Sequence, residues 1–196
     1  NNADGLLFQI HSDEDVLFQV AAIDAVALKM NKLALIHVAT SQMQPADGQF
    51  DAIHLANRTA LACLGGYSMS KGLVVLDTLM DIDRGDFPRG GLIDRRGNLN
   101  LSGRYLKSLL AFFEPSRLQH PLVIEKTSTK QAHTLVRFKR NGRQFCLCLS
   151  QEIGSTRIKT ITQELGKIQD CFDLQNGAFI DIDRNESSSA GLLLAL

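Results

Sequence analysis

Two short stretches of this sequence carry residues that could bind a phosphate-containing ligand. Gly90 and Gly91 have no side chain to hold a ligand away from the backbone, so a phosphate, a ribose or a base could approach closely there. Thr129 ends a run of hydroxyl residues ahead of Lys130, and such hydroxyls can receive phosphate oxygens where a helix begins. Both stretches also have a structural interpretation, the first as a turn entering a strand and the second as a helix cap.

Acidic residues and cysteines offer two further kinds of chemistry. Asp81, Asp83 and Asp86 stand close together and could coordinate a divalent metal, because hard cations prefer oxygen ligands; the alternative is a solvated acidic loop. Cys146 and Cys148 would point to one face of a strand, but no second Cys or His pair stands at the spacing of a metal site. The four cysteines are therefore expected to be buried, reduced thiols, which suits a cytoplasmic protein.

The elements that must position these residues follow from hydrophobic periodicity. Residues 88–106 are predicted to form two paired strands with a tight connection, and we expect the fold to be organised around them. Apolar residues recur at the helical period over 13–30, where Ser12 can cap the helix. The apolar run 33–39 predicts a buried strand in which His37 is a core or edge histidine.

Farther along the chain, a helix is expected from about residue 57, ended by Gly65 and Gly66, and 73–80 predicts a strand or a buried helix. The segment 134–149 predicts a β-hairpin, since its central Asn-Gly tolerates the positive φ angles of a two-residue turn. The remaining predicted elements are helices at 103–113 and 164–172 and strands at 122–125, 157–161 and 178–182.

Composition excludes several classes of protein. The 21 basic and 21 acidic residues balance, which favours neither a nucleic acid nor an anionic membrane as a partner. Hydrophobic residues make up 44% of the chain, as in a folded domain, and no apolar run approaches the roughly 20 residues of a membrane span. We expect one α/β domain over 1–185, with a central mixed β-sheet flanked by helices, and a C-terminal tail at 186–196. Because the sequence begins with asparagine, the chain could be a piece of a longer protein.

The order of these elements, together with three short motifs, resembles the diadenylate cyclase domain family, whose members condense two ATP molecules into cyclic di-AMP. The resemblance implies Mg²⁺ or Mn²⁺ with ATP, an adenine nucleotide as the partner, and Glu152 as a metal ligand. The motifs, which lie within residues 13–165, are Gly90-Gly91-Leu92-Ile93 with Gly103-Arg104-Tyr105-Leu106, then Thr129-Lys130-Gln131, then Ser150-Gln151-Glu152-Ile153-Gly154. The nucleotide site that the resemblance implies consists of Arg89, Gly90, Gly91, Thr129, Lys130, Gln131 and Ser150.

Two departures from the family's motifs argue against catalysis. Arg89 stands where the family has an aspartate implicated in metal binding, and arginine stays cationic and offers no lone pair. The phosphate motif Gly-Thr-Arg-His-Arg keeps only its threonine and one cation at 128–132. At about 3 kcal/mol for each lost group, two or more losses would remove roughly four orders of magnitude in rate. Asp86, close to Arg89, could substitute for the missing carboxylate.

The resemblance therefore implies a degenerate relative that binds an adenine nucleotide or a protein partner in a regulatory or sensing role, with contacts to another copy possible. Active synthesis of cyclic di-AMP is a third alternative. One conflict stands against the family, because its members have a helix where 134–149 predicts a hairpin. The second hypothesis rests on that hairpin: residues 53–68 resemble the start of a PAS sensor domain, which implies a small-ligand sensor or an interaction domain.

Overall fold

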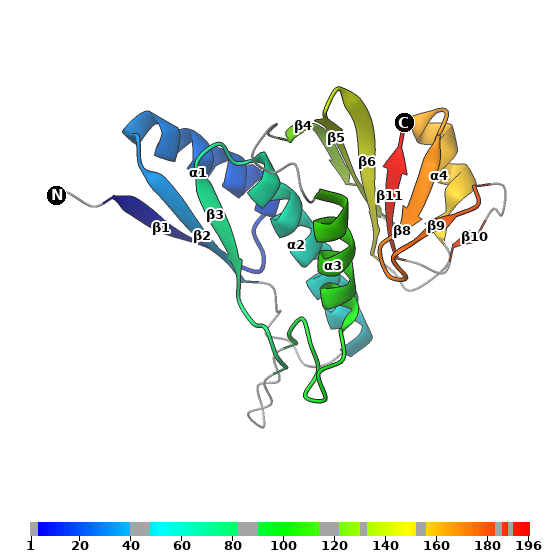
Figure 1. The fold of residues 1–196 in the computed structure, drawn as a ribbon, viewed down its shortest axis with the longest axis horizontal. Helices are drawn as coiled ribbons and strands as arrows, with labels where there is room; N and C mark the ends of the chain where they lie inside the picture. The colour runs from blue at the N-terminus through cyan, green and yellow to red at the C-terminus, as the bar shows by residue number, and fades with distance from the viewer. Residues whose placement is uncertain are drawn as a thin grey trace.

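Two main β-sheets make up most of the molecule, with helices between them (Figure 1). The computed structural model describes residues 4–39, 48–81, 90–113, 122–129, 133–151, 156–182, 186–187 and 190–196. One sheet is parallel and belongs to the first part of the chain, and the other is antiparallel and belongs to the second part. Helices α2 and α3 pack against each other in the middle of the molecule and contribute to the core beneath the antiparallel sheet.

The parallel sheet is built from two consecutive strand–helix units and a third strand. Its strands lie in the order β1-β2-β3, as expected when each crossover helix returns the chain to the next position. The side chains of Ile10, Ile36 and Val38 are buried under α1 and α2. These elements are β1 (Gly5–Ile10), α1 (Val16–Met30), β2 (Leu33–Val38), α2 (Gly48–Ser68) and β3 (Gly72–Leu76).

The first helix confirms the predicted periodicity but not the predicted cap. Helix α1 begins at Val16, and Asp15 is its N-cap, with its side chain accepting a hydrogen bond of 2.9 Å from the backbone N–H of Phe18. Ser12 therefore lies before the helix, in the connection from β1. Asn31, with a φ of 50°, ends the helix in the left-handed conformation that asparagine tolerates.

The second helix is longer than predicted at both ends. Gly65 and Gly66 do not end it, because α2 continues to Ser68. A Cβ atom on Gly65 would lie 3.2 Å from Cγ2 of Val20 in α1, tighter than most contacts of that kind. Gly65 therefore serves the close approach of α2 to α1, and the interpretation of the two glycines as a helix terminus was wrong.

In the described residues between β3 and α3, 77–81 and 90–100, backbones cross in close contact, and the predicted strand pair is present only as a short antiparallel pairing. Helix α3 (Leu101–Phe113) confirms the predicted helix and begins two residues earlier, where a strand was expected. That pairing consists of an antiparallel bridge of Ile93 with Leu99 and a hydrogen bond of 2.8 Å from the N–H of Asp94 to the carbonyl of Asn98. Ile93 also forms a parallel bridge with Met80. A Cβ atom on Gly103 would collide with the carbonyl oxygen of Leu92, so the start of α3 touches this segment directly.

The antiparallel sheet contains the predicted hairpin at its centre. Strands β5 (His133–Arg140) and β6 (Arg143–Ser150) pair throughout, joined by Asn141 and Gly142 at φ angles of 50° and 76°. The full strand order is β4-β5-β6-β11-β8-β9. The other members are β4 (Val123–Thr129), β8 (Asp170–Asp173), β9 (Ala178–Ile180) and β11 (Gly191–Ala195).

The last third of the chain differs most from the sequence-based expectation. Helix α4 (Ile158–Leu165) occupies the place of a predicted strand, and β8 occupies part of a predicted helix. Two short strands, β7 (Thr156–Arg157) and β10 (Glu186–Ser187), pair antiparallel in this region as a separate two-stranded sheet. Residues 191–195, expected in a tail, form the strand between β6 and β8, and every residue of it is buried.

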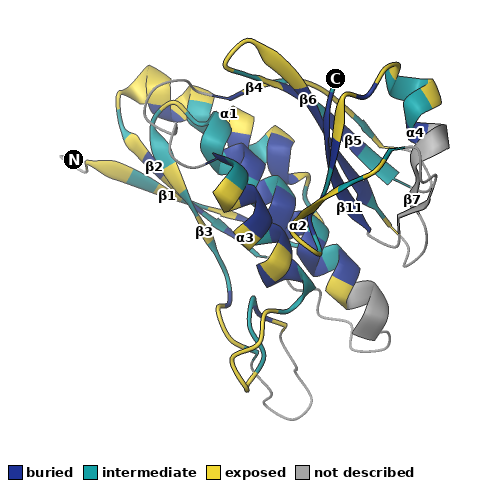
Figure 2. Cartoon of the chain, turned by 45° about the vertical axis from the view of Figure 1, so that its right-hand side comes forward, coloured by how far each residue is buried: buried dark blue, intermediate teal, exposed yellow. Residues whose placement is uncertain are grey.

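The structure is an α/β domain, as predicted, and the predicted mixed sheet is confirmed only in part: parallel and antiparallel strands both occur, but in separate sheets. Parallel neighbours need a crossover connection, usually a helix, and such helices connect β1 to β2 and β2 to β3. Strands β5 and β6 are joined by only two residues and pair antiparallel. The parallel strands therefore lie in the first part of the chain and the antiparallel strands in the second part. The largest core cluster lies between α2, α3 and the antiparallel sheet, with Tyr105, Phe113, Phe138 and Leu147 almost fully buried (Figure 2). Among the described helices, none is both long enough and apolar enough to cross a membrane.

Replacing Gly103 with alanine tests the backbone crossing. Alanine is favoured over glycine within a helix by about 1 kcal/mol, but here the methyl group would meet a backbone carbonyl that cannot rotate away. We expect Gly103→Ala to lower the free energy of unfolding by about 2 kcal/mol in urea titrations, as for an overpacked core. The matched control is Gly66→Ala, whose Cβ would lie 3.4 Å from Cβ of Val74, and which should leave stability unchanged or raise it. Equal urea midpoints for Gly103→Ala and the unsubstituted chain would contradict the close contact between Gly103 and the carbonyl of Leu92.

Candidate functional site

The predicted glycine pair serves the fold itself. The N–H of Gly91 donates to Oδ1 of Asp81 at 2.7 Å, and a Cβ on Gly91 would lie 2.6 Å from the carbonyl carbon of Met80. Asp81 also accepts a hydrogen bond of 2.8 Å from the side chain of Asn100. A close approach to the backbone of Gly91 was therefore predicted correctly, but the approaching group is another part of the protein's own backbone.

The other residues of the predicted nucleotide site are only partly within the described structure. Thr129 lies on β4 with its hydroxyl 3.4 Å from that of Thr134. Ser150 ends β6, where its N–H donates to the carbonyl of Ala190 and its own carbonyl accepts from the side chain of Asn57. The remaining members, outside the described residues, are Asp86, Arg89, Lys130, Gln131 and Glu152. The predicted Mg²⁺ or Mn²⁺ and the predicted partners stay predictions.

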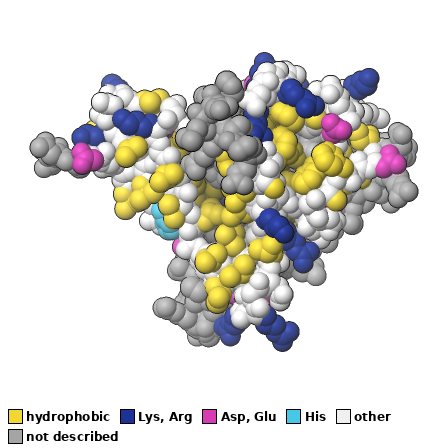
Figure 3. All heavy atoms as spheres, in the orientation of Figure 1, with side chains coloured by type: hydrophobic (Ala, Val, Ile, Leu, Met, Phe, Trp, Pro, Cys, Tyr) yellow, Lys and Arg dark blue, Asp and Glu magenta, His cyan; other side chains and the backbone are white. Residues whose placement is uncertain are grey.

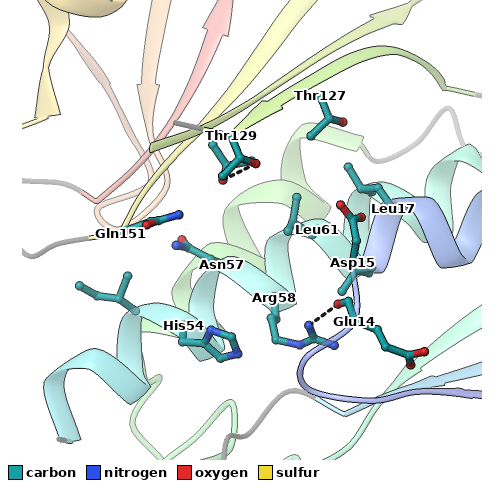
Figure 4. Close-up of a pocket in the computed structure, with 13 residues that line it drawn as sticks. Glu14, Asp15, Leu17, His54, Asn57, Arg58, Leu61, Thr127, Thr129 and Gln151 are labelled. Carbon is teal, nitrogen blue, oxygen red and sulfur yellow. Dashed lines mark hydrogen bonds between the residues drawn. The ribbon is translucent and has the colours of Figure 1, made fainter. Parts of the chain in front are cut away.

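A pocket of about 290 Å³ lies where the parallel part meets the antiparallel sheet (Figure 4). The start of α1 and the first half of α2 form one side of it, and β4 and β5 form the other. Its polar lining consists of Glu14, Asp15, His54, Asn57, Arg58, Thr127, Thr129, Thr134 and Gln151.

Arg58 is the central polar group of this pocket, and its guanidinium donates hydrogen bonds to three backbone carbonyls. The side chain is only 6% exposed and donates to the carbonyls of His11 at 2.7 Å, Glu14 at 2.8 Å and Ala39 at 2.9 Å. Burial lowers the pKa of the guanidinium, while nearby carboxylates in the connection from β1 to α1 act in the opposite direction. Arg58 therefore ties the ends of β1 and β2 to α2.

The rest of the pocket is poorly suited to a phosphate. Glu14 is held by the N–H of His11 at 2.7 Å, and Asp15 caps α1, so both carboxylates stay at the pocket wall. Burial, followed by the charge of Arg58, lowers the pKa of His54, which favours its neutral form. A phosphate would meet carboxylates here, and the cation beside them is already committed to carbonyls. The pocket is best described as a polar joint between the two halves of the molecule.

A second polar group lies at the carboxyl ends of the parallel strands. Nε2 of His37 is 3.3 Å from Oδ1 of Asp77, and the two side chains are 33% and 16% exposed. His37 is the last residue but one of β2, and Asp77 follows β3 directly. His37 lies on the same face as the exposed Leu33 and Leu35, away from the helices. The parallel register brings these two side chains together although they are far apart in the sequence.

The sequence offered only a weak signal for this pair. His37 was interpreted as a core or edge histidine, and Asp77 was not singled out. The signal that could have found them is a polar residue at the end of each of two predicted parallel strands, since ligands bind outside the carboxyl ends of such strands.

The cysteines confirm the expectation of buried thiols. Cys146, Cys148 and Cys171 are buried in one cluster between the antiparallel sheet and α4, and Cys63 is partly buried. Burial raises the pKa of Cys146 to about 12 and that of Cys171 to about 11, so both are thiols at neutral pH. In the described part of the chain, no group of three or more His, Cys, Asp or Glu could hold a metal ion. A cytoplasmic location stays a prediction.

One solved structure with a similar fold is a glycoside hydrolase. A family 39 glycoside hydrolase from the gut symbiont Bacteroides cellulosilyticus WH2 matches 92% of this chain with a TM-score of 0.51 and 14% sequence identity. The likeness is one of fold. Two others have TM-scores of 0.39: AmyP in complex with maltose, at 10% identity over 95% of this chain and 49% of its own, and an Anoxybacillus α-amylase, at 11% over 97% and 52%. No protein-family model and no curated protein matches the chain.

The family 39 enzyme is much longer than this chain, which corresponds to only 37% of it. Its fold is not that of a diadenylate cyclase, so the resemblance to that family was wrong, and so was the prediction of a degenerate nucleotide-binding relative. The same finding also contradicts the PAS-like alternative. The motifs that suggested kinship are explained by packing at Gly91 and Gly103, and the hairpin that conflicted with the family is real.

Replacing Arg58 with methionine tests whether its three hydrogen bonds stabilise the fold. The substitution keeps most of the apolar stem but leaves three backbone carbonyls without the donor that they have now. We expect Arg58→Met to lower the free energy of unfolding by about 3 kcal/mol, and Arg58→Lys to recover less than half of that loss because an ammonium lacks the planar fork. Arg104→Met on the exposed surface of α3 is the control, with an expected change within about 0.5 kcal/mol. An Arg58→Met chain as stable as the control would contradict the role given to Arg58.

Proposed function

We propose that this chain is part of a glycoside-hydrolase-like protein and binds a saccharide at the carboxyl ends of β1, β2 and β3. The observation that carries the proposal is the fold shared with the family 39 glycoside hydrolase over 92% of the chain. In barrels and open sheets of parallel strands, ligands are bound at the carboxyl ends of the strands. The polar side chains at that end are therefore the first candidates for contact with a sugar.

Three side chains supply the hydrogen-bonding groups that a sugar needs. Gln9 and His37 are cross-strand partners in β1 and β2, and Gln9 is exposed. Asp77 lies beside His37 at the end of the neighbouring strand. Each sugar hydroxyl both donates and accepts, and an amide, an imidazole and a carboxylate together offer both functions.

The Asp77 carboxylate also gives His37 a defined orientation. An acceptor at 3.3 Å favours the proton on Nε2, which leaves Nδ1 of the neutral ring as an acceptor for a sugar hydroxyl. Glycoside hydrolysis normally requires two carboxyl groups on either side of the bond. Since Asp77 is paired with an imidazole, we assign saccharide binding and not bond cleavage to this pair.

The test is saccharide binding by the polypeptide as its source cells produce it. We expect one oligosaccharide from a panel of gluco-, xylo-, manno- and galacto-oligosaccharides to raise thermal stability, by about 2.7 kcal/mol at 100 times its dissociation constant. His37→Ala and Asp77→Asn should each weaken binding in calorimetry at least tenfold, or about 1.4 kcal/mol.

The control for this experiment is Thr134→Val, which removes a hydroxyl from the pocket at the joint and should leave saccharide affinity unchanged. If Thr134→Val weakened binding and His37→Ala did not, the sugar would bind in the pocket lined by Thr134 and the proposed site would be refuted. The absence of any response to the whole panel would refute saccharide binding itself.

A further inference from the structure

One face of the parallel sheet is apolar and exposed. Leu7, Leu35 and Leu73 are cross-strand neighbours in β1, β2 and β3, and they are 74%, 40% and 53% exposed. Leu33 and Val75 extend this patch, which we call the open face. Figure 3 shows hydrophobic side chains gathered over this part of the molecule.

Parallel sheets are normally covered on both faces, because helical crossovers bury one face and a second layer or the rest of a barrel buries the other. Here α1 and α2 pack on the face formed by Ile10, Ile36 and Val38. Contiguous apolar surface of this kind marks an interaction site. The open face therefore lacks the layer that its composition requires.

The surroundings of the open face show what kind of layer fits. Beyond β3, at the edge of the sheet, lies an apolar hollow of about 390 Å³ that α2 and α3 also line, and Val74, Leu76, Leu106 and Leu110 face it. A strand added at the edge of β3 would contact these apolar side chains.

The outer side of α1 carries a second apolar stripe. Phe18, Ala22 and Ala25 are exposed at the spacing of one helical face, and Phe18 is 70% exposed. The stripe is distinct from the face of α1 that packs on the sheet, which includes Val16 and Val20. A neighbouring helix would cover it.

We propose that further parallel β/α units, supplied by polypeptide outside residues 1–196, pack on this surface. Their strands extend the sheet from β1 and from β3, their inward aliphatic side chains cover the open face, and a helix packs on the Phe18 stripe. A second copy of this chain laid face to face would cover the leucines but would leave the hollow and the stripe exposed. The family 39 enzyme supplies the scale of the missing part, because 63% of its chain (100% less the 37% covered) has no counterpart here.

The proposal shares the fold comparison with the proposed function but does not depend on saccharide binding. The test is the rate at which a maleimide reagent modifies a cysteine at position 35. Leu35→Cys is compared in two forms: recombinant 1–196, and the tagged polypeptide purified under native conditions from its source cells. Modification should be at least tenfold slower in the second form. The unsubstituted chain, with its four cysteines, provides the background rate in each form.

Arg143→Cys, at the exposed hairpin of the antiparallel sheet, is the matched control and should react equally in both forms. Equal rates at position 35 would overturn the proposal. Protection already present in recombinant 1–196, and growing with its concentration, would assign the open face to a second copy and would also overturn it. Leu7→Cys repeats the measurement at another position of the same row should Leu35→Cys fail to fold. Loss of saccharide binding would leave these rates unchanged.

Discussion

The arrangement of the parallel part depends on a buried guanidinium bonded to backbone carbonyls. Arg58 projects from α2 and holds the chain immediately after β1 and immediately after β2. These are the places where parallel strands leave a sheet, and the N–H of Ala39 also donates to the carbonyl of Ile10 there, at 2.9 Å. Fixing both of them to one helix sets where the carboxyl ends of the strands lie, and therefore where His37 meets Asp77.

Helix α2 is the structural link between the two sheets. On one side Ala62 belongs to the core beneath the parallel sheet, and on the other side Ala60 and Leu64 belong to the core that reaches Phe138 and Leu147. Such a helix must be narrow, which explains its alanines and Gly65. The hydrogen bond from Asn57 to the carbonyl of Ser150 adds a polar contact at the same junction.

Local patterns predicted those elements that depend on their own residues. The periodicity of α1 and the Asn-Gly turn between β5 and β6 needed no knowledge of the rest of the chain. Prediction from the sequence failed for elements whose structure depends on a neighbouring element. Gly65 serves contact with Val20 and not the end of a helix, and the apolar run of β11 is buried on both faces, so it shows no alternation. The candidate site gave only a weak signal for the same reason, because the strand register brings His37 to Asp77 and because the partners of Arg58 are carbonyls that every residue carries.

The position of β11 has a consequence for the order of folding during synthesis. The strands of the parallel sheet pair with one another, β1 with β2 and β2 with β3, so these partners are all present and can pair while translation continues. The antiparallel sheet cannot, because residues 191–195 are inserted between β6 and β8. Until those residues have left the ribosome, the two halves of that sheet expose the inner edges that β11 later joins, and this interval is when a nascent chain is most open to wrong pairing or to capture by chaperones.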